Sequence, residues 1–115
     1  MRSLGKNRTN KKGWRQGYWE FYYMDGKLHS KGLYKNGEKE GIWEYYYING
    51  NLECKGLYKD GEMNGYWEYY YPNGKLRLKG LYLNDIRNGI FENYYEDGSL
   101  KERGLYENGD LIKVL

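Results

Sequence analysis

Apolar and polar residues recur along this chain with a period of 24 residues. Glycines 17, 41, 65 and 89 mark the period, and each begins the string G-x-[WF]-E-x-Y-Y-x-[ND]-G-x-L-x-x-[KR]-G-L-Y. Aromatic and charged residues alternate within each copy, which is typical of strands that have two unlike faces. Four copies in register without an insertion predict a repeat protein.

Glycine-containing dipeptides predict where the strands end. Two-residue type I′ turns favour Asn-Gly and Asp-Gly because both central residues need a positive φ. One such dipeptide lies in the middle of each copy, at 25–26, 49–50, 73–74 and 97–98. A second set, at 36–37, 60–61 and 108–109, links each hairpin to the next. The prediction is an antiparallel meander of about eight regular strands, with a ragged strand at either end.

The predicted turns fix which residues face each other. A two-residue turn at 25–26 places Tyr23 opposite Leu28 and Trp19 opposite Gly32, which leaves room for the ring to lie flat on the sheet. The same arithmetic pairs an acid with a base in every copy, and each pair contributes about 0.2–1 kcal/mol. This structural ladder consists of Glu20–Lys31, Glu44–Lys55, Glu68–Lys79 and Glu92–Arg103.

The pattern predicts an all-β protein, an elongated single-layer antiparallel meander of 24-residue β-hairpin repeats. Residues 1–16 form a basic N-terminal arm with a degenerate half repeat. Four repeats follow at 17–40, 41–64, 65–88 and 89–112, and residues 113–115 close the chain. Stability in such an array comes from stacking between neighbouring repeats.

The two faces of this sheet differ in chemistry. One face carries the Trp and Phe positions, and the other carries the Glu–Lys ladder with neighbouring Tyr and Leu positions. Aromatic patches of sufficient area mark binding surfaces, but the same rings are also what a core needs. Both interpretations stay open for the central patch, which we predict as a protein-binding site: Trp43, Tyr45, Tyr47, Trp67, Tyr69 and Tyr71.

Composition excludes several classes of protein. Aromatic residues make up 19% of the 115 residues, there are 17 Gly and no Ala, and this argues against a helical bundle. With His29 and Cys54 as the single members of their types, we expect no cofactor, no metal site and no His-paired nucleophile. The glutamate column resembles paired catalytic acids, but a base opposite each one makes it a poor proton donor. We therefore expect a protein that is not an enzyme.

Charge is concentrated at the beginning of the chain, where residues 1–16 hold six Lys or Arg and no acid. Without a defined groove, such an arm makes nucleic acid an unlikely partner and leaves a membrane surface, an acidic partner or a capping role open. The arm has no apolar stretch like that of a secretory signal, so we expect a cytoplasmic protein. The segment LIKVL at 111–115 is either an edge strand that recruits a protein or a second copy, or a cap.

The strings at 17–37, 41–61 and 65–85 resemble the MORN-repeat-variant family, specifically its bacterial, antitoxin-like branch. The resemblance covers about residues 13–112. It implies a scaffold for protein binding, with an antitoxin or immunity-type neutraliser of a toxin or effector as the expected function. The alternatives are a glycan- or choline-binding cell-wall module and a membrane-associated scaffold.

Overall fold

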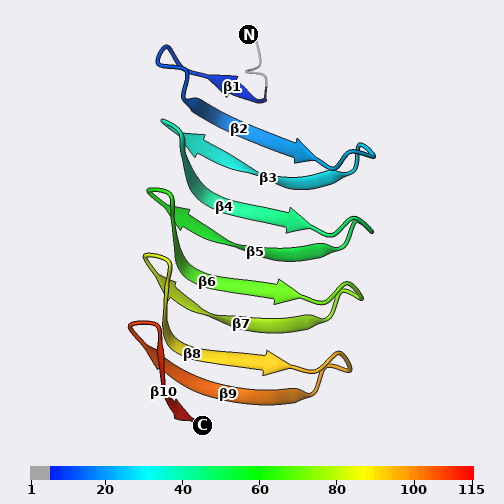
Figure 1. The fold of residues 1–115 in the computed structure, drawn as a ribbon, viewed down its shortest axis with the longest axis vertical. Helices are drawn as coiled ribbons and strands as arrows, with labels where there is room; N and C mark the ends of the chain where they lie inside the picture. Colours follow the sequence, from blue (N-terminus) through cyan, green and yellow to red (C-terminus); the bar gives the residue numbers. More distant parts are fainter. Residues whose placement is uncertain (1–5) are drawn as a thin grey trace.

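The computed structural model describes residues 6–115 as one antiparallel sheet in which every strand pairs with its neighbours in chain order (Figure 1). The sheet is elongated, with extents of 52 × 31 × 25 Å. The strands are β1 (Arg8–Thr9), β2 (Arg15–Tyr22), β3 (Leu28–Lys35), β4 (Glu38–Tyr46), β5 (Leu52–Lys59), β6 (Glu62–Tyr70), β7 (Leu76–Leu83), β8 (Ile86–Tyr94), β9 (Leu100–Glu107) and β10 (Asp110–Val114). The predicted all-β meander is confirmed, with eight long strands and a short one at each end.

The register across the long strands follows the sequence prediction. Glu20 lies opposite Lys31 and Trp19 lies opposite Gly32 in the first hairpin. The corresponding acid and base are partners in the other three hairpins. Each of the three ladder lysines also faces the acid of the next repeat, as Lys55 does with Glu68, so the ladder is continuous along the sheet.

The two sets of turns differ, although their dipeptides look alike. Asn36 and Gly37 both have positive φ, 50° and 84°, as the predicted type I′ turn requires. At Asp25-Gly26 that prediction is wrong: Gly26 alone has a positive φ, and its N–H donates to the Tyr23 carbonyl at 2.9 Å. The Asp25 carboxylate accepts from the Lys27 N–H at 3.0 Å, which favours a three-residue loop. The resulting bulge places Tyr22, not Tyr23, opposite Leu28.

A bulge that the sequence analysis missed begins each repeat at its first glycine. In the third repeat, Gly56 pairs with Trp67 while the adjacent Leu57 pairs with Asn64, so Gly65 and Tyr66 are extra residues in β6. Gly65 has a φ of 74°, in the left-handed region. The Leu57 carbonyl accepts the indole N–H of Trp67 at 3.1 Å. Trp19 and Trp43 make the same kind of bond, so each buried indole nitrogen has a partner.

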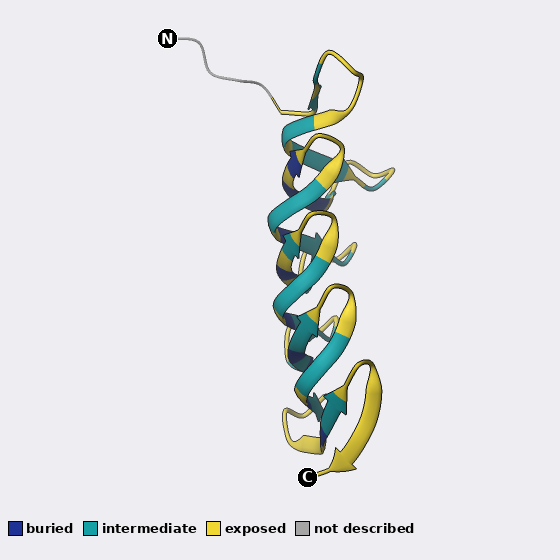
Figure 2. Ribbon diagram, turned by 90° about the vertical axis from the view of Figure 1, so that its left-hand side faces the viewer, coloured by how far each residue is buried: buried dark blue, intermediate teal, exposed yellow. Residues whose placement is uncertain are grey.

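The core is a row of rings that joins one repeat to the next. Trp43, Trp67 and Phe91 are 0%, 1% and 2% exposed. The expected pairing of ring and glycine within one hairpin is wrong in one respect: the Trp67 ring covers Gly56 of the preceding repeat. A Cβ on Gly56 would lie 2.1 Å from Cδ2 of Trp67. The buried residues therefore run along the middle of the sheet, while turns and β10 are exposed (Figure 2).

Hydrogen bonds between repeats follow the same plan. Each type I′ turn donates a backbone N–H to the repeat before it, as Gly61 does to the Lys39 carbonyl at 3.0 Å. On the opposite edge, a tyrosine hydroxyl donates to the repeat after it. The Tyr47 hydroxyl donates to the Tyr70 carbonyl at 2.5 Å, and Tyr23 and Tyr71 do the same. These contacts are those of a one-dimensional array in which each unit is stabilised by its neighbours.

Candidate binding surface

The predicted aromatic patch lies on the face that forms the core. We call this face the aromatic face, and its centre is Trp43 and Trp67, whose side chains are buried. Tyr45 and Tyr69 are half-buried beside them. The remaining two members of the patch, Tyr47 and Tyr71, lie half-buried at the loop edge and hold the next repeat through their hydroxyls. The patch is brought together as predicted, its rings serve packing, and its role in binding a partner stays a prediction.

Edge-to-face contacts connect the rings of the aromatic face. Tyr34 and Trp43 meet at 5.0 Å and 81°, and Tyr58 and Trp67 meet at 5.0 Å and 83°. Such aromatic pairs contribute about 0.5–1.5 kcal/mol beyond the area that they bury. The Tyr45 and Tyr58 hydroxyls are hydrogen-bonded at 2.8 Å. The rings are thus fixed by one another across repeat boundaries.

The protein's own cations lie over all four ring clusters. In the third cluster Arg77 lies 5.6 Å from the centre of the Tyr69 ring, and in the other three the cation comes from one recurring strand position. Arg15 lies 5.0 Å from the centre of the Trp19 ring, Lys39 lies 4.9 Å from Trp43, and Arg87 lies 4.7 Å from Phe91. Met63 stands at this position in the third repeat. Burial lowers the pKa of Lys39, and its ammonium group donates to the Tyr45 hydroxyl at 2.8 Å. These clusters therefore already hold a ligand from within the chain.

Burial also shifts the pKa values of titratable side chains on the aromatic face. It raises the pKa of Tyr45 and of Tyr69, and raises that of the Cys54 thiol to about 12. A thiol with so high a pKa is a small apolar side chain at neutral pH and not a nucleophile.

The opposite face, which we call the ladder face, carries the charged column. Glu20 accepts from Lys6 at 2.5 Å and from the Tyr18 and Tyr22 hydroxyls at 2.8 and 2.5 Å. The Lys6 bond, with those from the two tyrosines, lowers the pKa of Glu20 to about 2. In the next two repeats the tyrosine bond alone is kept, from Tyr46 to Glu44 and from Tyr70 to Glu68.

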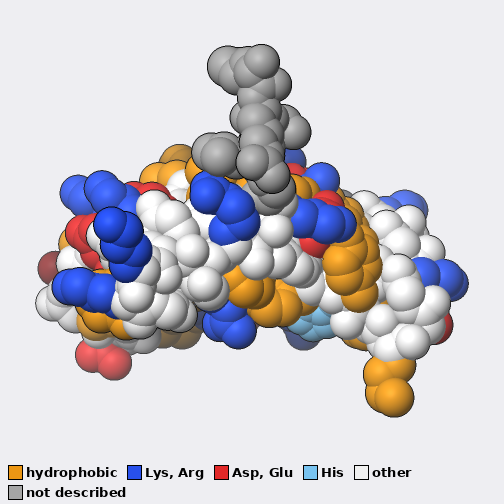
Figure 3. Space-filling model, turned by 90° about the horizontal axis from the view of Figure 1, so that it is seen from above, with side chains coloured by type: hydrophobic (Ala, Val, Ile, Leu, Met, Phe, Trp, Pro, Cys, Tyr) orange, Lys and Arg blue, Asp and Glu red, His pale blue; other side chains and the backbone are white. Residues whose placement is uncertain are grey.

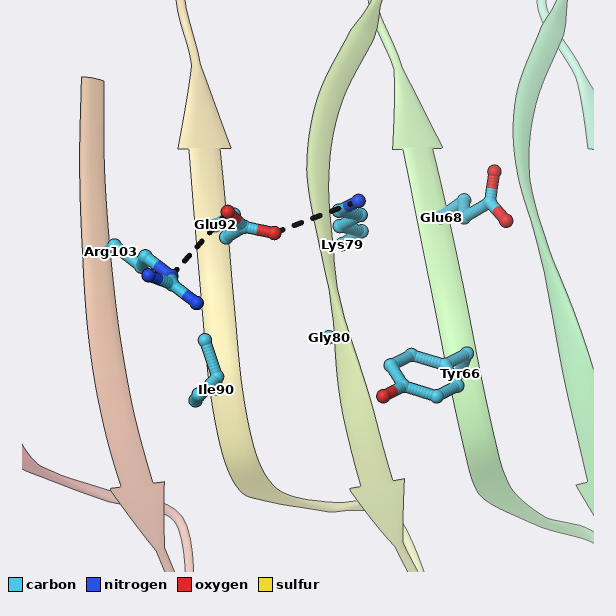
Figure 4. A pocket seen from close by; sticks show the side chains of 7 residues that line it. All are labelled: Tyr66, Glu68, Lys79, Gly80, Ile90, Glu92 and Arg103. Carbon is cyan, nitrogen blue, oxygen red and sulfur yellow. Dashed lines mark ion pairs between the residues drawn. The ribbon is translucent and has the colours of Figure 1, made fainter. Parts of the chain in front are cut away.

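Ion pairing along the ladder is less regular than the register suggests. Glu92 lies 3.5 Å from Arg103 and 3.6 Å from Lys79, and the Lys6–Glu20 pair completes the ion pairs among residues 6–115. Figure 4 shows Glu92 between these two cations, with the Glu68 carboxylate turned away from Lys79. The ladder is thus aligned in every repeat, but salt-bridged within a hairpin in the fourth repeat alone of the described chain.

An exposed apolar column runs beside the ladder and was missed as a binding candidate. It contains one residue from each long strand: Tyr18, Leu33, Ile42, Leu57, Tyr66, Leu81, Ile90 and Leu105. Tyr66 is 70% exposed and Ile42 is 59% exposed. The signal was present in the sequence, because the residue after the first glycine of every repeat is Tyr or Ile. Within the column, Leu57 and Leu81 lie beside the bulge glycines Gly65 and Gly89, and Leu81 and Leu105 are half-buried. The Tyr or Ile of every repeat stays exposed.

The apolar column and the ladder meet in a depression of about 380 Å³. Tyr66 and Ile90 line it on one side, and Glu92 with its two cations lines the other (Figure 4). Gly80 forms part of its lining. Apolar walls with a few charged groups are what a surface needs to receive a side chain of a partner.

The N-terminal end of the sheet is basic, and Figure 3 views the molecule from that end. The structure describes this arm from Lys6, and Arg2 lies outside the described residues. β1 pairs with β2. The Asn7 side-chain amide donates to the Glu20 carbonyl at 3.2 Å, and the Asn7 side-chain oxygen accepts from the Glu20 N–H at 2.8 Å. The described part of the arm therefore covers the edge of β2. Trp14 is 46% exposed at the turn, with the Lys12 ammonium 4.9 Å from its ring centre.

No group of three or more His, Cys, Asp or Glu side chains within residues 6–115 is arranged to hold a metal ion. The same part of the chain contains no helix with the length and apolar character to cross a membrane.

Strands, turns and inter-repeat contacts together define a β-hairpin repeat protein. The chain belongs to the MORN repeat variant family, whose model matches residues 15–36, 39–60, 63–84 and 87–111. The predicted family is confirmed, whereas its bacterial, antitoxin-like branch stays a prediction. A search of curated proteins found no match.

Proposed function

We propose that this MORN repeat protein is a non-enzymatic protein-binding module and that it binds through the ladder face. The apolar column carries the proposal, because every repeat exposes one Tyr or Ile side chain there on a regular sheet. Contiguous exposed apolar patches mark interaction surfaces, and tyrosine is enriched among residues that dominate binding energy. The aromatic patch contributes indirectly. Trp43 and Trp67 pack on the opposite face of the sheet and fix the strands that carry the column.

The charged side chains beside the column suit a rim better than an active site. Glu44 and Glu68 accept from tyrosine hydroxyls, and Glu92 lies between two cations. Each of these carboxylates is already held by side chains of the protein itself, which supports a structural role. Charged groups around an apolar centre are the usual composition of a protein interface.

The partner that we propose is a toxin or effector protein in the cytoplasm, which the module neutralises as an antitoxin or immunity-type protein. An elongated sheet with extents of 52 × 31 × 25 Å can cover a large area of a partner without rearranging. The fully exposed β10 adds a second possible contact, a homodimer formed by pairing of edge strands.

Two matched isoleucines provide the test. Ile42 is 59% exposed on the ladder face, and Ile48 is 57% exposed in the loop after β4. Ile42→Glu and Ile48→Glu therefore introduce the same charge at the same exposure in two different places. Partners captured from native lysate are compared by quantitative mass spectrometry, with circular dichroism to confirm that both sheets are intact.

The proposal expects Ile42→Glu to lose a protein partner that wild type and Ile48→Glu both retain. Equal recovery of every protein by the two variants, with both folded, would remove the ladder face as the binding surface.

A further inference from the structure

We infer that the occupant of the apolar column is an acidic amphipathic helix of the partner protein. This inference rests on the proposed function and specifies it further. Two observations carry it: the spacing of the apolar column, and the arrangement of charges beside it.

The spacing of the column matches that of a helix. Each repeat contributes two strands, so equivalent residues such as Ile42 and Tyr66 lie about 9.6 Å apart along the sheet. Seven residues of an α-helix span about 10.5 Å, and a tilt of roughly 20–25° removes the difference. A helix with one apolar residue per heptad therefore meets the column once in every repeat. From Tyr18 to Ile90, the contact needs about 20 residues of helix.

An extended peptide does not fit this spacing. Side chains on one face of a strand recur every ~6.6 Å, which agrees neither with the strand spacing of ~4.8 Å nor with its double. In a polyproline II helix, side chains on one face recur every ~9.3 Å, which is close to the ~9.6 Å spacing of the repeats. An experiment described below distinguishes this conformation from an α-helix.

The charges beside the column favour acidic groups on the helix. Lys31 and Lys55 make no ion pair and no hydrogen bond through their side chains within residues 6–115, and Lys31 has one ring contact, at 6.0 Å from Tyr46. The carboxylates on either side of them, by contrast, accept hydrogen bonds from tyrosines. The lysines are therefore the ladder groups left free to pair with a partner.

The other border of the column has no such preference. Lys35 lies opposite Glu38 and Lys59 lies opposite Glu62 at the type I′ turns, and none of these four side chains makes an ion pair or a side-chain hydrogen bond within residues 6–115, so free groups of both signs lie there. The geometry thus predicts a helix with an apolar stripe and acids along one flank only, seven residues apart. The depression between Tyr66 and Ile90 is the place for its largest apolar side chain.

Two designed peptides of about 21 residues test this inference on the full chain. Both carry Leu at the first and fourth heptad positions, and they differ in carrying Glu or Lys at the fifth position. Fluorescence anisotropy at low and high salt measures their binding. We expect wild type to bind the acidic peptide at least tenfold more tightly than the basic one, with the difference shrinking at high salt.

A charge-reversal variant supplies the decisive comparison. In K31E/K55E the preference should reverse towards the basic peptide. In K27E/K113E, which makes the same change in net charge at exposed lysines away from the column, the preference for the acidic peptide should persist. A loss of that preference in the control variant, or no preference in wild type, would overturn the inference.

Two further experiments distinguish an acidic helix from other occupants of the apolar column. An acidic peptide with proline at its centre that binds as well as the intact one would contradict the helical conformation. Vesicles containing phosphatidylserine that bind wild type but not K31E/K55E, while neither peptide binds, would assign the column to a membrane surface instead. If Ile42→Glu loses a captured protein but the acidic peptide does not bind, the proposed function stands and the acidic helix is wrong.

Discussion

Adding one methyl group at Gly56 tests how neighbouring repeats are joined. In Gly56→Ala the new Cβ would lie 2.1–2.4 Å from Cδ2, Cε2 and Cγ of Trp67. No rigid indole tolerates such contacts, and Trp67 is 1% exposed, so it has no free space to enter. The ring has to leave its site.

The cost follows from what the ring gives up. Removing a buried Trp side chain from its contacts costs about 3–5 kcal/mol. The indole bond to the Leu57 carbonyl, worth about 0.5–1.5 kcal/mol, is lost with it. Alanine regains about 0.5–1 kcal/mol over glycine through backbone entropy. We therefore expect Gly56→Ala to lower the free energy of unfolding by about 3–5 kcal/mol, a large share of the ~5–15 kcal/mol typical of a domain.

Gly104→Ala is the matched control. Its Cβ would lie 2.7 Å from Cδ1 of Leu111, the end of a flexible side chain that is 48% exposed. Leu111 can turn away, so we expect a change within about 1 kcal/mol. Urea unfolding followed by circular dichroism and tryptophan fluorescence measures both variants.

A double-mutant cycle adds a second check. In a Trp67→Leu background, Gly56→Ala should cost much less than in wild type, because the residue over Gly56 is then flexible. A Gly56→Ala protein as stable as Gly104→Ala would refute the packing of each ring on the preceding repeat.

Three other outcomes follow from the same contacts. Tyr47→Phe removes the hydroxyl bond to the Tyr70 carbonyl and should cost about 0.5–1.5 kcal/mol in urea unfolding, whereas Tyr95→Phe, at the same position of the last repeat, should cost less than about 0.5 kcal/mol. Burial, followed by the hydrogen bond to the glutamate, raises the pKa of Tyr46 and Tyr70 to about 12, so their contribution to stability is complete below pH 10 and is lost as the pH rises towards 12. Carbon-13 NMR of the tyrosine rings, with these two assigned through their Tyr→Phe variants, measures this; ionisation of either ring near pH 10 in the native protein would contradict it. Cys54 should react with a thiol reagent at pH 8 at least about tenfold more slowly in the native protein than in urea, and equal rates would show that the thiol is not buried.

Much of the fold could be predicted because four copies of the repeat each test the same strand register. The alignment of Glu68 with Lys79 depends on the pairing parity of the whole hairpin, and four copies give the same answer. The turn at 25–26 shows the limit of such reasoning. Asp-Gly suits a type I′ turn, but it also suits a type I turn followed by a left-handed glycine, and the dipeptide does not distinguish them. Because the bulge there lies beyond the ladder, the wrong turn left the register of the ladder unchanged.

The packing partner of each ring lay beyond what pairing arithmetic can give. Gly56 has Trp43 as its partner in one neighbouring strand and Trp67 in the other. Register alone treats these two rings equally. The choice depends on side-chain direction and on the bulge at Gly65, which brings the Leu57 carbonyl within reach of the Trp67 indole.

The sequence alone does not distinguish an aromatic face that packs from one that binds a partner. Ring content identified the aromatic face as special but could not tell a core from an interface. Exposure separates them, since Trp43 is 0% exposed on one face and Ile42 is 59% exposed on the other.

Photo-crosslinking from two tyrosine positions tests most directly whether a partner is held by the ladder face. Tyr66 is 70% exposed within the apolar column, and Tyr95 is 50% exposed in the loop after β8. Benzoylphenylalanine keeps the first ring and adds a photoreactive benzoyl group in place of the hydroxyl, which the exposure of both positions accommodates. If the column is the docking surface, position 66 gives a crosslinked partner and position 95 gives none. Crosslinks from position 95 with none from position 66 would contradict the account.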